Sequence, residues 1–119
     1  MRGQILENGT RTATGNGTAV QVGAAIAGQT IYSGLHVTAA SGSSPTLDVT
    51  VESDDAENFA TAQLRITHAQ TAVVGSELLS LAGAVTDVWW RVVMTIGGGS
   101  PSFTAYHTLA ILTDNPPSV

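Results

Sequence analysis

The chain has 119 residues, of which 11% are charged against about 25% in typical soluble domains, and its formal net charge is −5. It contains no cysteine, which excludes disulfides, thiolate catalysis and Cys-based zinc sites, and it contains no lysine. Its cations are four arginines, so the sequence offers no basic stripe for a phosphate backbone, and we expect no direct nucleic-acid partner.

The length fits one domain. No window approaches 18 consecutive apolar residues, and the first eight residues lack the apolar stretch of a signal peptide. We therefore expect no membrane partner, and we expect the protein to be made in the cytoplasm and used without a signal-peptide route.

Residues 1–17 are rich in glycine and polar residues, with Ile5 and Leu6 as their apolar anchors. A segment of this composition gains little from burial, so the sequence predicts an extended N-terminal arm. Residues 18–112 are predicted to form the folded domain. Residues 113–119 contain Pro116 and Pro117 and are predicted to leave it as an extended C-terminal tail.

Between the two ends, apolar residues alternate with polar ones at a period of two, which is typical of half-buried β-strands. The inward positions are predicted to be Ile31 to Ala39 and Leu47 to Val51 at odd numbers, Ala60 to Ile66 at even numbers, Val88 to Ile96 at even numbers, and Phe103 to Ile111 at odd numbers. Weaker strands are expected over 18–22, 71–74 and 76–81. The pattern predicts an all-β fold, a single β-sandwich or jelly roll of about eight antiparallel strands.

Two similar blocks, Gly42-Ser43-Ser44-Pro45 and Gly98-Gly99-Ser100-Pro101, each stand between two predicted strands. Glycine permits positive φ, and proline fixes φ where the next strand begins. Each block is therefore predicted to be a hairpin turn. For the Gly97–Ser100 run, a hairpin loop is favoured over a phosphate cradle because a strand follows it, not a helix.

Trp89 and Trp90 are neighbours in one predicted strand, so their rings point to opposite faces of the sheet. Trp90 falls on the apolar face. Trp89 falls on the other face with Arg91, either as a partly covered ring against which Arg91 leans or as an interface anchor.

No residues form a recognisable catalytic, metal or cofactor site. Residues 53–58 carry several oxygen ligands but lack the spacing of a calcium loop, which favours a solvated acidic turn over a metal site. His36, His68 and His107 come from three separate segments without ligand spacing, and we interpret them as structural histidines.

Several blocks resemble small β-sandwich proteins encoded among the virion structural genes of tailed bacteriophages. The blocks are Leu35–Ala39, Ser44–Val49, Ser53–Asp55, Trp90–Val92, Ile96–Gly98 and Ser100–Phe103. The resemblance covers roughly residues 30–112. It implies a head decoration (cement) protein that binds the major capsid protein on the outer surface of the expanded head and associates with itself, commonly as a trimer.

The expected function is therefore a non-enzymatic virion protein that stabilises the capsid. The candidate interface residues are Ile5, Leu6, Tyr32, Trp89 and Arg91. The alternatives are a minor tail protein and a carbohydrate-binding or adhesion module with Trp89 or Tyr32 as the stacking platform; a small enzyme is the least favoured.

Overall fold

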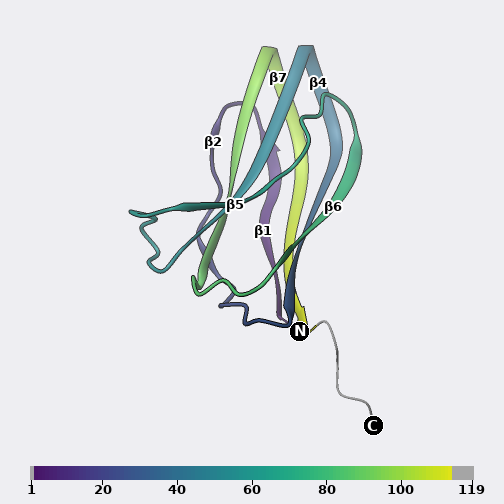
Figure 1. The fold of residues 1–119 in the computed structure, drawn as a ribbon. Helices are drawn as coiled ribbons and strands as arrows, with labels where there is room; N and C mark the ends of the chain where they lie inside the picture. The colour runs from purple at the N-terminus through teal and green to yellow at the C-terminus, as the bar shows by residue number, and fades with distance from the viewer. Residues whose placement is uncertain (1, 114–119) are drawn as a thin grey trace.

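The computed structural model describes residues 2–113, which form one open antiparallel sheet without a helix (Figure 1). None of these residues belongs to a helix long and apolar enough to cross a membrane. The strands are β1 (Arg2–Arg11), β2 (Gly15–Asn16), β3 (Val20–Gln21), β4 (Gln29–Asp54), β5 (Gln63–Thr67), β6 (Gly75–Ala82) and β7 (Trp89–Thr113). The prediction of an all-β antiparallel fold is confirmed.

β4 and β7 form the centre of the sheet and pair along their whole length, from Gln29 opposite Thr113 to Asp54 opposite Trp89. β1, β2 and β3 all pair with β7, while β5 and β6 both pair with β4. The sheet is thus built from four segments in the order 2–21, 89–113, 29–54 and 63–82. Figure 1 shows β4 and β7 side by side, and both reverse direction at the same level.

The predicted hairpin turns are wrong, because the Gly-Ser-Pro blocks lie within β4 and β7 and do not join separate strands. Pairing continues on both sides of the blocks, with Ser41 opposite Ser102 and Leu47 opposite Ile96, and only the register shifts between them. The two blocks lie opposite each other, so both strands bend together and remain paired on both sides of the bend. Four predicted strands are therefore the halves of two long ones.

The bend is tightly packed around two glycines. Gly42 has a φ of 123°, and a Cβ added there would lie 2.9 Å from Pro101 Cα; Gly98 has a φ of 107°, and its Cβ would lie 2.8 Å from Pro45 Cα. Each block thus places its glycine against the proline of the other block. Both positions need glycine because L side chains rarely adopt this φ and because backbone fills the space.

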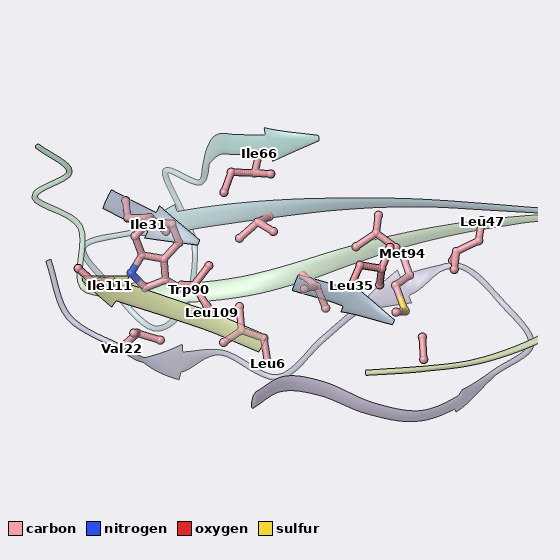
Figure 2. Close-up of a cluster of buried hydrophobic side chains, with 14 of the residues drawn as sticks. Leu6, Val22, Ile31, Leu35, Leu47, Ile66, Trp90, Met94, Leu109 and Ile111 are labelled. Carbon is pink, nitrogen blue, oxygen red and sulfur yellow. The ribbon is translucent and has the colours of Figure 1, made fainter. Parts of the chain in front are cut away.

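The bend folds the sheet over, so that the inward side chains of its two halves meet in one core. Ile31, Leu109 and Ile111 come from one half and Trp90 from the other, and Figure 2 shows them in one cluster. The predicted alternation is confirmed for most of these positions, and the fully buried ones include Ile31, Leu47, Val49, Val51, Trp90, Val92, Leu109 and Ile111. It is wrong at Ala39, which is exposed because the register shifts after Val37, so that Ala40 packs against the core instead. Trp90 Nε1 also donates a hydrogen bond to Gly23 O (3.0 Å).

Residues 2–11 form β1 rather than an arm outside the sheet. They pair with β7 from Arg2 opposite Ile111 to Arg11 opposite Phe103, and Leu6 is 3% exposed within the core. Backbone hydrogen bonds to β7 compensate for the low apolar content of this segment. The predicted boundary between arm and domain after residue 17 does not correspond to a break in the structure, since Gly17 N donates a hydrogen bond to Val92 O of β7. The predicted C-terminal tail lies outside the described residues except for Thr113.

The predicted strand over 60–67 is shorter and partly reversed. β5 begins at Gln63, and Leu64, which was predicted to point inward, is 62% exposed. The register with β4 shifts between Val51 and Glu52, which breaks the alternation. Arg65 donates instead to Ser53 Oγ (2.8 Å) and pairs with Asp87 (3.1 Å). Of the weaker strands, 18–22 and 76–81 correspond to β3 and β6, while residues 71–74 form only a bridge at Thr71.

We expect Gly42→Ala and Gly98→Ala each to lower the free energy of unfolding by about 1 to 3 kcal/mol, because alanine adds both strain and overlap at the bend. Urea denaturation measures the change. Gly75→Ala is the matched control, since a Cβ there has no neighbour within 4 Å. Equal stability of all three variants would show that the bend tolerates side chains.

Candidate functional site

Among residues 2–113, one outer face of the sheet carries no Asp, Glu, Lys or Arg side chain. It is formed by β1, the second half of β7, the first half of β4 and β6, whose residues pair in three consecutive rows. We call it the uncharged face, and its rows are Gly3, Ala110, Tyr32 and Ser80; Ile5, Thr108, Gly34 and Leu78; Asn8, Tyr106, His36 and Ser76.

Large apolar side chains are exposed on the uncharged face. Ile5 is 57% exposed and Leu78 is 68% exposed, at opposite ends of the same row. A hollow lined by Gly3, Ile5, Thr108 and Ala110 lies on this face. Two of the predicted interface residues, Ile5 and Tyr32, therefore fall on one surface, while Leu6 lies in the core and does not.

The other outer face is charged and partly covered. Arg91 Nε contacts Glu52 Oε1 at 2.9 Å, and the Arg91 guanidinium lies 4.3 Å from the centre of the Phe59 ring. The structure thus places Arg91 on Phe59 of the 55–62 loop, not on Trp89, and an ion pair already holds it. Trp89 is half-buried between Gln21 and Asp54 in adjacent strands. Trp89 and Arg91 are therefore separated from Ile5 and Tyr32 by the thickness of the folded sheet.

A chain of polar side chains crosses the core. Glu77 Oε1 lies 2.8 Å from His68 Nδ1, His68 Nε2 lies 2.8 Å from Ser33 Oγ, and Ser33 Oγ lies 2.6 Å from His107 Nε2. Ser33, His68 and His107 are at most 2% exposed. Ala69 N also donates to Glu77 Oε1 (3.0 Å). The network fixes the segment after β5 to β4, β6 and β7.

The hydrogen-bond partners specify one order of donors for neutral imidazoles. His68 Nδ1 donates to the Glu77 carboxylate, which leaves His68 Nε2 to accept from the Ser33 hydroxyl. Ser33 Oγ then accepts from His107 Nε2, and His107 Nδ1 keeps a lone pair. This atom is buried without a hydrogen-bond partner among the described residues. Burial, together with the nearby His68 and His36, lowers the pKa of His107 to about 3.

The order Glu77, His68, Ser33 is also the hydrogen-bond order of a Ser–His–acid triad. Here, however, Ser33 is fully buried, and its oxygen is shared by two imidazoles, so a substrate carbonyl does not reach Oγ in this structure. We interpret the chain as a structural network. Residue spacing in the sequence does not predict this network. The available signal is that Ser33 and His107 are polar residues at positions that the alternation predicts to point inward.

The acidic run after β4 is held by its own loop. Asp54 is 1% exposed and accepts hydrogen bonds from the backbone of Asp55, Ala56 and Thr61 and from the Thr61 hydroxyl. Within residues 2–113, no group of three or more potential metal ligands lies close enough together to hold an ion. The segment is not solvated throughout as predicted, because Asp54 is buried and fixes the 55–62 loop through these hydrogen bonds.

A comparison with protein-family models gives no match for this chain, and a comparison with curated proteins gives none either. The predicted relationship to phage virion proteins therefore depends on the sequence blocks alone.

We expect the stability of the protein to fall as the pH drops below about 6.5, the ordinary pKa of histidine. The pKa of His107 is depressed to about 3 in the folded state, so between these values the unfolded chain binds one more proton. The uptake of this proton lowers the free energy of unfolding by about 1.4 kcal/mol for each pH unit. The contribution of neutral His107 to the free energy of unfolding is fully present above pH 6.5 and is lost progressively as the pH falls below this value.

Urea unfolding between pH 6.5 and 5 measures this slope, in a window above the lowered pKa of Glu77, whose carboxylate accepts hydrogen bonds from Ala69 and His68. His107→Gln should flatten the slope, because glutamine does not titrate. His36→Gln, at an exposed position, should leave it unchanged. A slope that persists in His107→Gln would assign the acid sensitivity to another group.

Proposed function

We propose that this chain is a non-enzymatic structural protein of a tailed-bacteriophage virion, a decoration protein with a jelly-roll-type β-sandwich fold that binds the outer surface of the expanded capsid. The observation that carries the proposal is the uncharged face, a continuous sheet surface with exposed Ile5 and Leu78 and without a charged side chain. Exposed apolar surface of this kind marks interaction sites in soluble proteins.

The distribution of charge supports a contact through this face. The ion pairs of the described residues lie elsewhere: Arg91 with Glu52 on the other face, Arg65 with Asp87, and Arg11 with Glu7 at the inner side of β1. A subunit that docks on the uncharged face therefore removes few polar groups from water, so desolvation costs little. The same face suits packing against further copies of the chain in an oligomer.

Decoration stabilises a capsid by mass action. A protein that binds only the expanded lattice lowers the free energy of that lattice, and many copies multiply the effect. The long antiparallel pairing of β4 with β7 gives such a binder a core that needs no disulfide.

We expect Thr108→Lys to reduce occupancy on expanded, undecorated heads by about tenfold or more, because it places an unpaired charge at the centre of the uncharged face. Electron microscopy of heads mixed with purified protein counts the bound copies. Thr95→Lys is the matched control, since Thr95 is exposed on the same strand and its pair Asp48 is on the charged face.

Equal occupancy of the two variants would contradict the role of the uncharged face. If the unaltered protein does not bind heads but co-purifies with tails, the tail alternative replaces decoration.

A carbohydrate-binding module is the second candidate, because Tyr32 and Tyr106 are exposed in part on the same face. Quenching of protein fluorescence by sugars, together with no binding to heads, would favour it.

A further inference from the structure

A groove opens at the edge of the sheet beside β6. It encloses about 250 Å³ between residues 69–74 and the first residues of β6, and its floor includes Leu35 and Val37 of β4. Both floor residues belong to the core and are at most 4% exposed. The groove is therefore a place where the apolar interior reaches the surface.

The groove exists because the outermost segment does not follow the bend of β4. Thr71 pairs with Leu47, which follows the bend of β4, and Gly75 pairs with Val37, which precedes it, while residues 72–74 make no pair with β4. This short unpaired stretch leaves Val73 66% exposed and Val74 60% exposed. Two aliphatic side chains thus line the groove without being covered.

One wall of the groove carries a carboxylate. Glu77 is the only charged residue among the residues that line it, and its side chain is 34% exposed. Glu77 Oε1 is occupied by His68 and Ala69, whereas Oε2 makes no hydrogen bond within residues 2–113. The pKa of Glu77 is lowered because Ala69 N and His68 donate hydrogen bonds to the carboxylate. The groove therefore combines aliphatic walls with a negative charge at one end.

We propose that this groove binds a basic side chain on an extended apolar segment of a partner protein. The aliphatic stem of a lysine or arginine lies along Val74 over Leu35, and its cation contacts Glu77 Oε2. Long basic side chains bury their stems on apolar surface while the charged end stays in contact with water or an anion, which matches this combination of walls and charge.

The partner is a different protein, not a second copy of this chain. The chain has no lysine, and its arginines are engaged: Arg11, Arg65 and Arg91 in ion pairs, and Arg2 in a hydrogen bond to Ala24 O. Within residues 2–113, every arginine already has a partner, so we assign the cation to a different protein. This inference goes beyond the proposed function, because the groove borders the uncharged face at Ser76 but would bind a partner of different chemistry, a basic side chain.

The test uses three blocked tripeptides, acetyl-Val-Lys-Val-amide and its norleucine and glutamate counterparts, titrated into the full chain and followed by the backbone amide signals of residues 69–77. We expect saturable shifts with the lysine peptide and at least about fivefold weaker binding of the other two, which corresponds to roughly 1 kcal/mol. Equal binding of all three peptides, or no binding of the lysine peptide, would overturn the inference.

Two variants locate the contact. Glu77→Gln should weaken binding of the lysine peptide to the level of the norleucine peptide while keeping an acceptor oxygen for His68 and Ala69. Val74→Ser should weaken both peptides, and it is safe for folding because Val74 is exposed. Leu64→Ser, an exposed aliphatic position on β5, is the matched control and should change nothing. Unchanged binding in Val74→Ser would place the peptide elsewhere.

The capsid experiment keeps the two proposals distinct. Loss of head binding in Thr108→Lys with normal peptide binding supports the uncharged face alone. If the lysine peptide does not bind but head occupancy is normal, the proposal for the groove is wrong and the proposed function is unaffected.

Discussion

The structure depends on one constraint, the pairing of β4 and β7 on both sides of a shared bend. Two neighbouring strands can reverse direction and stay paired on both sides only if both bend at the same place. The opposed Gly-Ser-Pro blocks meet this condition, with Gly42 against Pro101 and Gly98 against Pro45. The two flanking segments then follow β7 and β4, and the folded sheet encloses one core. The surfaces, the polar network and the groove are all positioned by this bend.

The bend also explains why each surface has its own character. The segment 2–21 follows β7 closely, and β1 completes the uncharged face. The segment 63–82 follows β4 less closely, since the unpaired residues 72–74 leave the core open at the groove. The chain Glu77–His68–Ser33–His107 ties this looser segment back to the centre of the sheet. The network therefore restrains the wall of the groove that carries the carboxylate.

Sequence alternation predicts which residues face the core because a strand has a strict period of two, and Ile31, Trp90 and Leu109 follow it. It fails at Leu64 because a register shift next to Arg65 breaks the period. Glycine and proline mark where the chain turns but do not distinguish a hairpin from a bend, since that choice depends on the strand opposite. Of the candidate interface residues, Ile5 and Tyr32 lie on the same surface, while Leu6 is buried in the core. The polar network escapes prediction because Ser33 and His107 are 74 residues apart and meet only in the folded sheet.

The position of β1 beside the end of β7 has a mechanical consequence. Arg2 pairs with Ile111, so the two ends of the described chain lie at the same end of neighbouring antiparallel strands. A force that pulls on both ends would separate these strands one hydrogen bond at a time, whereas a force applied across the sheet loads the whole β4–β7 ladder at once. A chain built in this way resists tension best when it is gripped by its faces, and least when it is held by its termini.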